Sequence, residues 1–400
     1  MNLKRRQLLT TGSAGLAAAA LSLSLPGCAD PATRDRRALN ALGHDMEGRV
    51  LLPDDEAYPL AAAPNSARWA NVLPQGIAMC ANDHDVQKCV DWVREEGKPF
   101  AVRSGGHSLA GFSTTTGLLI DVSAMNKVTL DRDEGVAHIQ AGATNQDMAE
   151  ALHHTGFAVP SGRCPTVGIA GLALGGGWGF AATKSGLTCD SLINTDIVTA
   201  DGRKRTVGEA SVGGDADLFW ALRGGGGGNF GVNTSFTFRA HEVSDVTVFS
   251  IVWQGDKHVE LMTALQEIQN QHALNMSSRT KVAPRRAGQF PQRSELGVET
   301  LGVYFGSVQE LRDAMAPAFR ILPPIQEDIR AMSYWQARDY MVTDEQIGLF
   351  ETTSRYVGTT MGPDGLETML GWMQKWPGGS LRQKNIGVLF SIGGKVREKA

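Results

Sequence analysis

The sequence predicts an α+β fold, and three features of the chain lead to this class. Strand-like and helix-like segments are mixed without the strict alternation of a repeated βαβ array. Glycine accounts for 47 of the 400 residues, and 25 of these glycines lie between Gly105 and Gly231. After about Val243 the glycine density falls, and segments of ordinary composition follow. We therefore expect a glycine-rich α+β domain followed by a second, more conventional α+β domain.

Length and charge narrow the possible classes of protein. A chain of 400 residues is long enough for two or three domains and for a large core without disulfides. The net charge of −4 and the absence of a long basic run argue against a nucleic-acid partner. No metal site is expected. The expected segments are an export signal at 1–29, a linker or arm at 30–65, and domains at 66–242 and 243–400.

Residues 1–29 have the organisation of an export signal. Arg5 and Arg6 precede a weakly apolar stretch rich in Ala, Ser and Gly that ends near Leu25. The arginine pair is typical of a Tat signal, so we expect export of the folded protein to the periplasm or the extracellular space. The Gly, Ser and Thr content argues against a membrane-spanning helix. Cys28 lies in a lipobox-like Leu-Pro-Gly-Cys sequence, which leaves a lipid anchor open as an alternative.

Local patterns predict the elements of the glycine-rich domain. Apolar residues at helical spacing predict a helix over 85–96 that ends at Gly97. A second helix is expected over 145–154, with Thr144 as its N-terminal cap. Short apolar or alternating runs predict strands at 100–103, 118–122, 137–141 and 234–238.

The same patterns continue in the second domain. Alternating or apolar runs predict strands at 246–252, 299–305 and 386–390. Helical periodicity predicts helices at 259–271, 309–319 and 365–374. No internal repeat is present.

Three glycine-rich segments, at 103–108, 161–179 and 220–231, require a common explanation. Successive backbone N–H groups in the first could bind a phosphate, with Arg103 adding charge. Bare backbone in the second could lie against a planar ring system. The third contains a GxGxxG match, but the residues after it alternate like a strand, which excludes a Rossmann fingerprint. No Walker A lysine follows any of the three segments.

Together these segments resemble the berberine-bridge-enzyme-like group of the PCMH-type FAD-linked oxidoreductases. The likeness covers roughly 66–390 and rests on four stretches: 102–108, 162–179, 186–190 and 217–231. It implies a PCMH-type FAD-binding domain of two α+β subdomains, followed by an α+β substrate domain. The resemblance further implies that His107 bonds the flavin 8α-methyl group and that Cys164 bonds flavin C6. The other cofactor-binding residues that it implies are Arg103, Ser104, Gly105, Gly106, Ser108, Gly111, Asp121, Ser123, Val167, Gly168, Gly171, Leu174, Gly175, Gly176, Gly177, Gly179, Gly186, Asp190, Ile197, Val198, Gly231 and Val232.

The resemblance also implies an activity. We expect an oxidase that transfers hydride from a sugar or alcohol hydroxyl to bicovalent FAD and then to O2, giving H2O2. Val167, three residues after Cys164, stands where the family has a valine associated with oxygen access. Two alternatives stay open: a dehydrogenase with another acceptor, and a catalytically impaired, secreted FAD-binding protein. The family's usual base lies beyond the position of Ala400, so we expect a C-terminally incomplete substrate domain and name no base.

The remaining reactive side chains receive simpler interpretations. Cys189 is expected in the core, and Cys80 and Cys89 either form a disulfide or are buried thiols, burial being favoured. Three aromatic residues of the second domain could face a substrate or be buried: Tyr304, Trp335 and Tyr356. The sequence leaves the oligomeric state undetermined.

Overall fold

The computed structural model describes residues 31–285, 290–342, 352–375 and 386–398. The expected export signal and Cys28 lie outside these residues. The chain divides into two units, residues 1–38 and residues 39–400, and the sheets described below all belong to the second. No helix among the described residues is both long enough and apolar enough to cross a bilayer.

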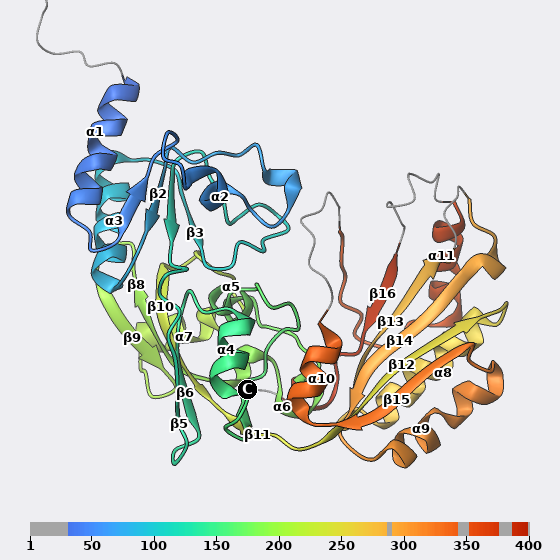
Figure 1. Cartoon of the computed structure of the whole chain (residues 1–400). Helices are drawn as coiled ribbons and strands as arrows, with labels where there is room; N and C mark the ends of the chain where they lie inside the picture. Colours follow the sequence, from blue (N-terminus) through green and yellow to red (C-terminus); the bar gives the residue numbers. More distant parts are fainter. Residues whose placement is uncertain (1–30, 286–289, 343–351, 376–385, 399–400) are drawn as a thin grey trace, which may run out of the picture. The chain divides into compact units, whose positions relative to one another are not determined.

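The first sheet has four strands in the order β1-β2-β4-β3 (Figure 1). β2 and β3 both run parallel to β4, and β1 pairs antiparallel with β2. Its strands are β1 (Arg49–Leu51), β2 (Gly76–Met79), β3 (Phe100–Arg103) and β4 (Leu118–Asp121). The accompanying helices are α1 (Pro31–His44), α2 (Tyr58–Ala62), η1 (Ala67–Trp69) and α3 (Asp83–Glu96). The segment expected as a linker or arm thus contributes an edge strand, and Leu51 and Tyr58 join the core of this sheet.

Two sequence signals in this sheet are confirmed. Helix α3 ends at Gly97, which adopts the left-handed conformation with φ of 62°. Glycine reaches this conformation without the steric cost that other residues meet there. The strand expected at 100–103 is β3.

The second sheet is antiparallel, with the order β5-β6-β10-β8-β9. Its strands are β5 (Val128–Asp131), β6 (Val136–Gln140), β8 (Leu192–Val198), β9 (Lys204–Gly208) and β10 (Val232–Arg239). A short pair, β7 (Phe157–Ala158) and β11 (His241–Glu242), lies apart from it. Its helices are α4 (Asn145–Leu152), α5 (Ile169–Leu174), α6 (Ala182–Ser185), η2 (Thr188–Ser191) and α7 (Gly214–Leu222). Because β10 follows the GxGxxG match directly, the exclusion of a Rossmann fingerprint is confirmed.

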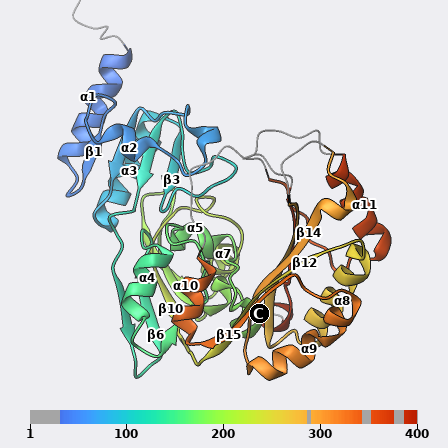
Figure 2. The same ribbon diagram turned by 45° about the vertical axis from the view of Figure 1, so that its right-hand side comes forward.

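The third sheet is also antiparallel and has the order β15-β12-β14-β13-β16. Its strands are β12 (Val246–Gln254), β13 (Met276–Pro284), β14 (Leu296–Tyr304), β15 (Gln326–Met332) and β16 (Gly387–Phe390). Its helices are α8 (His258–Gln271), η3 (Arg293–Glu295), α9 (Val308–Ile321), α10 (Tyr334–Met341), α11 (Pro363–Gln374) and η4 (Gly394–Arg397). Figure 2 shows α8, α9 and α11 on one face of this sheet.

Alternation along the strands of the third sheet separates its two faces. Phe249, Ile251 and Trp253 point to the face under α8, α9 and α11, where they join the largest buried cluster. Val246 and Val248 point to the opposite face and pack with residues of α10. Because successive strand residues face opposite sides, one face builds the core while the other remains available for different contacts.

Strands that lack a strong apolar pattern escaped the sequence analysis. β8, β13 and β15 were not expected, and neither was α7. β13 carries Arg279 and Lys281 in alternation with buried small residues, and its burial comes from the strands and helices around it. In the second glycine segment, where bare backbone was expected, 169–174 forms the short helix α5.

We expect the helix-covered face of the third sheet to carry much of the stability of this part of the chain. Leu261→Ala should lower the free energy of unfolding by about 2–5 kcal/mol, because Leu261 of α8 is fully buried and leaves a cavity. Leu274→Ala is the matched control, since that leucine is 52% exposed, and it should cost less than about 1 kcal/mol. Urea unfolding followed by circular dichroism measures both changes. Equal effects of the two substitutions would contradict this assignment of the core.

Candidate functional site

Two loops that are distant in sequence touch through their backbones. The first, 104–108, follows β3, and the second, 164–168, precedes α5. A Cβ on Gly105 would overlap the nitrogen of Gly168, and a Cβ on Gly168 would overlap the hydroxyl of Ser104. The His107 Nε2 atom lies 2.7 Å from the Thr166 hydroxyl. The fold therefore brings the loops of His107 and Cys164 together, and only glycine allows this approach.

The N-terminus of α4 holds the Cys164 loop. Thr144 caps the helix through a capping box with Asp147, which confirms the cap that the sequence predicts. The first two helical N–H groups, of Asn145 and Gln146, donate to the carbonyl oxygens of Val167 and Pro165, each at 3.0 Å. The Asn145 side-chain amide donates to the Cys164 carbonyl at 2.8 Å. Helix-terminal donors that would otherwise lack partners thus fix the loop that carries the thiol.

The third glycine segment lies against the other two. The Gly226 N–H donates to the Leu174 carbonyl at 2.8 Å, which joins this segment to the end of α5. The Cβ position of Gly228 is 4.0 Å from a methyl group of Val102 in β3. The three glycine-rich segments therefore share one position in the fold, because all three meet between β3 and α5.

The residues at this meeting point fit a cofactor that carries both a pyrophosphate and a ring. Among the described residues, no protein acceptor receives the backbone N–H groups of Ser104, Gly105 and Gly106. Such consecutive donors form a nest for an anion. The Cβ positions of Gly171 and Gly224 face open space, so neither backbone is covered by protein there. An imidazole and a thiol, both half-buried, complete the set of reactive groups.

Arg103 has a structural use. Its guanidinium donates to the carbonyl oxygens of Ser113 at 2.9 Å, of Ala62 at 3.1 Å and of Ala61. Only 5% of the residue is exposed. Burial lowers the pKa of Arg103, while neighbouring Asp121 raises it. The Arg103 guanidinium, which the sequence analysis assigned to phosphate binding, thus ties the His107 loop to Ala61 and Ala62.

Asp121 is the buried counterpart of Arg103. Burial raises the pKa of Asp121, while hydrogen bonds from Ser123 and the charge of Arg103 lower it. The Ser123 N–H donates to the Asp121 carboxylate at 2.8 Å. Both residues were expected to bind the cofactor, and within the protein they order the end of β4.

The other glycines predicted for the site are required by close approaches within the protein. A Cβ on Gly111 would overlap the Trp69 ring, and a Cβ on Gly179 would overlap the Ser161 carbonyl. Gly231 has φ of 145° and crosses β8 so closely that a Cβ would overlap the Val198 carbonyl. Similar approaches occur at Gly177 against Thr188 and at Gly186 against Asp190. The other residues predicted for the cofactor lie in the same segments: Ser108 in the loop after β3, Leu174 at the end of α5, Gly175 and Gly176 directly after it, Ile197 in β8 and Val232 in β10.

The cysteines fall into two environments. Cys189 is buried, as expected, and burial raises the pKa of its thiol to about 11. Cys80 and Cys89 are free, fully buried thiols with their sulfur atoms 3.8 Å apart, so burial, the favoured alternative, is what the structure shows. Cys164 is half-buried and lies at the loop junction. Among these four cysteines, only Cys164 combines partial exposure with a place beside His107.

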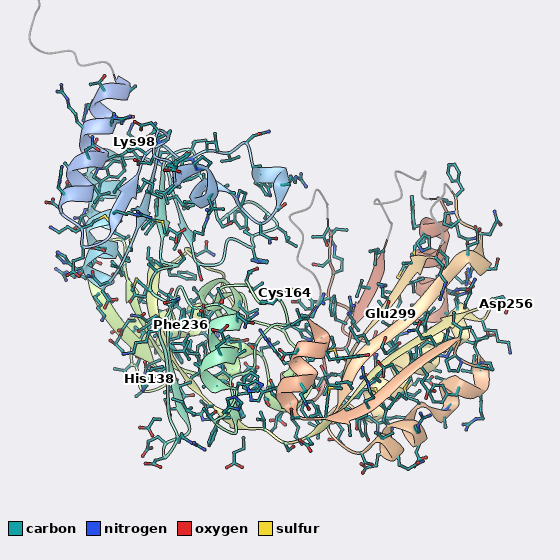
Figure 3. All side chains as sticks on the ribbon, viewed as in Figure 1. Lys98, His138, Cys164, Phe236, Asp256 and Glu299 are labelled. Carbon is teal, nitrogen blue, oxygen red and sulfur yellow. The ribbon has the colours of Figure 1, made fainter. Side chains whose placement is uncertain are left out.

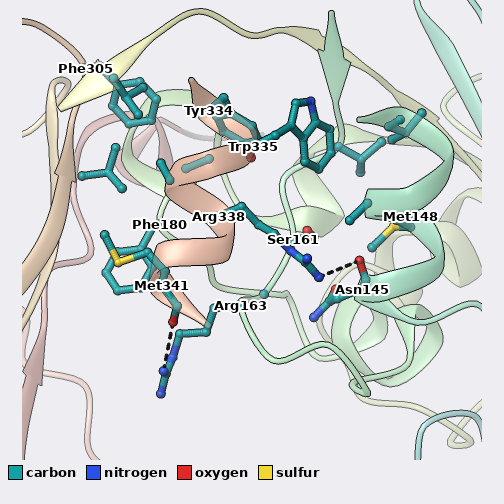
Figure 4. Close-up of a pocket in the computed structure, with 18 residues that line it drawn as sticks. Asn145, Met148, Ser161, Arg163, Phe180, Phe305, Tyr334, Trp335, Arg338 and Met341 are labelled. Carbon is teal, nitrogen blue, oxygen red and sulfur yellow. Dashed lines mark hydrogen bonds between the residues drawn. The ribbon is translucent and has the colours of Figure 1, made fainter. Parts of the chain in front are cut away.

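A small cavity lies between α4 and α10 (Figure 4). Met148 of α4 and Trp335 and Met341 of α10 line it, and Arg163 at its edge donates to the Met341 carbonyl at 3.4 Å. Neither His107 nor Cys164 lines this cavity. Of the aromatic residues left open by the sequence, Trp335 forms part of this wall, Tyr304 is buried in the third sheet, and Tyr356 is 91% exposed.

Three charged residues of the third sheet were missed by the sequence analysis. Arg279 and Lys281 of β13 and Glu299 of β14 occupy the sheet face opposite α8, α9 and α11 (Glu299 and Cys164 are labelled in Figure 3). Arg279 lies close enough to Cys164 and Arg163 for each to affect its ionisation. The alternation of charged with small residues over 277–282 was the signal that could have identified this strand.

We expect Arg103 to act through the fold. Arg103→Met should lower the free energy of unfolding by about 3–5 kcal/mol, because it leaves the buried Asp121 carboxylate uncompensated. Arg94→Met, which removes an exposed arginine paired with Asp91, should cost less than about 1 kcal/mol. Chemical denaturation of both variants tests this. A stable Arg103→Met protein with weakened flavin retention would instead support a phosphate-binding role.

Comparisons with known proteins agree with this site. Residues 74–208 match the family described as FAD binding domain. The uncharacterized FAD-linked oxidoreductase YgaK of Bacillus subtilis is 33% identical over 294 residues, which cover 73% of this chain and 63% of YgaK. The chain thus spans less than two thirds of the length of this relative.

Two solved structures share the fold. Glucooligosaccharide oxidase of Acremonium strictum, known with a 6-S-cysteinyl, 8α-N1-histidyl FAD, superposes with a TM-score of 0.74 and 26% identity, over 90% of this chain and 76% of that one. The BBE-like 1 protein of Physcomitrella patens superposes with a TM-score of 0.77 and 22% identity, over 90% and 78% of the two chains. The resemblance found in the sequence is confirmed, as is the α+β fold class. The chain thus contains an FAD-binding domain and is similar to the PCMH-type FAD-linked oxidoreductases, the family of the berberine-bridge-enzyme-like proteins.

Proposed function

We propose that this protein is an oxidase for a hydroxyl-bearing small molecule, a sugar or an alcohol, with FAD bonded to both His107 and Cys164. The observation that carries the proposal is the contact between the two loops that present these residues. The His107 imidazole reaches the hydroxyl of Thr166, two residues beyond Cys164. A single ring system placed at this junction is within reach of both nucleophiles.

The geometry favours one nitrogen of His107 for the proposed histidyl bond. Thr166 engages Nε2 of His107 at 2.7 Å, so we assign the bond to flavin to Nδ1. Glucooligosaccharide oxidase, with its 8α-N1-histidyl and 6-S-cysteinyl FAD, supports a two-point attachment of this kind. The thiol of Cys164 is held for the second bond because its own carbonyl and those of Pro165 and Val167 accept hydrogen bonds from α4.

The cofactor, when bound, accepts hydride from the substrate and passes the electrons to O2, giving H2O2. The residues of the chain position the reactants around it. The N–H groups of the 104–106 loop would bind the pyrophosphate, and Arg103 holds that loop in place. Val167, which is half-buried in the Cys164 loop, would control the access of oxygen to the ring.

We further propose that the protein is exported through the Tat pathway by the signal at 1–29, with Cys28 a candidate for lipid attachment. Support comes from the Arg5-Arg6 pair and the weakly apolar stretch after it. Transport in the folded state suits a flavoprotein, because the cofactor can be attached before the protein crosses the membrane.

Covalent attachment can be tested by denaturing the purified protein with acid. The pellet should remain yellow, and its intact mass should exceed that of the polypeptide by one FAD. His107→Ala and Cys164→Ala should each remove one bond, and the double variant should release the flavin into the supernatant. Cys189→Ala is the matched control and should retain both bonds, because that thiol is buried. Flavin in the wild-type supernatant would overturn the bicovalent assignment.

The acceptor can be tested at Val167. Val167→Ile adds a methyl group to a half-buried position, so it should slow reoxidation of the reduced flavin by dissolved oxygen about tenfold or more while leaving reduction by substrate unchanged. Val167→Ala, which reduces the side chain, should reoxidise at least as fast as the wild type. Stopped-flow absorbance follows both half-reactions. Wild-type flavin that stays reduced in air would identify a dehydrogenase instead.

A further inference from the structure

One face of the third sheet carries two cations, and the ionisation of one of them, Arg279, is affected by Cys164. Lys281 lies directly opposite Glu299 in the β13–β14 register, and its ammonium is 2.5 Å from that carboxylate. The Arg279 guanidinium is 3.8 Å from the other oxygen of Glu299. The three side chains are 14–29% exposed. Because they are partly desolvated, their electrostatic interaction with a neighbouring charge is stronger than it would be in bulk water.

The charges of this group do not cancel. Arg279 and Lys281 contribute two positive charges, and Glu299 contributes one negative charge. Burial lowers the pKa of Arg279, and Arg163 lowers it further, whereas Glu299 and the Cys164 thiolate raise it. The group therefore carries one net positive charge on partly buried side chains. Such a charge is costly without a counter-ion, and an anionic ligand would compensate it.

Two hydrogen-bond donors at this place lack acceptors. Within the described part of the chain, the buried Arg279 Nε and Trp178 Nε1 atoms have no hydrogen-bond partner. Both side chains adjoin Phe390: Arg279 pairs with it across the β13–β16 register, and the Trp178 ring lies 4.8 Å from the Phe390 ring, centroid to centroid. Two unsatisfied donors therefore flank one half-exposed aromatic ring.

We propose that Arg279, Lys281 and Phe390 form a substrate subsite for a carboxylate-bearing sugar, such as a hexuronic acid. The proposal rests on the oxidase function proposed above and narrows its substrate class. The guanidinium and ammonium groups bind the carboxylate, and the half-exposed Phe390 ring contacts the apolar face of the sugar. Glu299 orients the two cations and disfavours a second negative charge on the substrate.

The direct test is calorimetric titration of the purified flavoprotein with matched pairs of acidic and neutral sugars. D-glucuronate and D-galacturonate should bind about 10- to 100-fold more tightly than D-glucose and D-galactose, the range expected for one or two charge-assisted hydrogen bonds. Arg279→Gln should bring this ratio close to one, and Glu299→Gln should increase it. The preference should also shrink as the salt concentration rises, because the side chains are partly exposed.

Arg330→Gln is the matched control. Arg330 lies on the same sheet face but is paired with Asp328 at 2.8 Å, so its loss should leave the ratio unchanged. Circular dichroism verifies that each variant is folded. Equal binding of acidic and neutral sugars by the wild type, or an unchanged ratio in Arg279→Gln, overturns the proposal. An altered flavin spectrum in Arg279→Gln with an unchanged ratio would assign this arginine to the cofactor.

Flavin reduction separates this proposal from the oxidase function. Neutral sugars that bleach the flavin while uronates do not would overturn the subsite and leave the oxidase standing. Uronates that bind through Arg279 without bleaching the flavin would retain the subsite and overturn the oxidase.

Discussion

The close approach of Gly105 to Gly168 is the constraint on which the rest of the site depends. The two backbones are so near that neither position tolerates a Cβ, and the approach brings the His107 imidazole to the hydroxyl of Thr166. A side chain at either glycine would separate the two loops and remove the basis for a two-point attachment. Glycine here serves a steric purpose in a chain whose overall glycine content is high.

Each loop is held from behind by a different physical device. The Cys164 loop rests on the first N–H groups of α4, which are oriented by the Thr144 capping box. The His107 loop is held by the guanidinium of Arg103, whose N–H groups donate hydrogen bonds to three backbone carbonyls. Hydrogen bonds to backbone groups thus set the positions of both loops.

The third sheet separates two sets of side chains, because successive residues of its strands point to opposite faces. One set of residues builds the core with α8, α9 and α11, which leaves the alternate set to carry charges such as Arg279 and Glu299. A sheet with one face committed to packing can vary its other face without loss of stability. We therefore expect residues of β13, β14 and β16, rather than residues of the glycine loops, to determine the substrate preference of the proposed enzyme.

Local patterns were sufficient to predict the elements that have strong local signals, and the glycine-rich motifs were sufficient to predict FAD as the cofactor. The Gly97 stop, the Thr144 cap and strand 100–103 depend on interactions within a few residues, so a local pattern is sufficient to predict them. Only the tertiary structure decided which distant atoms meet. It directed Arg103 to the carbonyls of Ala61 and Ala62, and it placed Arg279 beside Cys164. Such pairings follow from strand order and register, which are set by packing across the whole sheet and which no local pattern encodes.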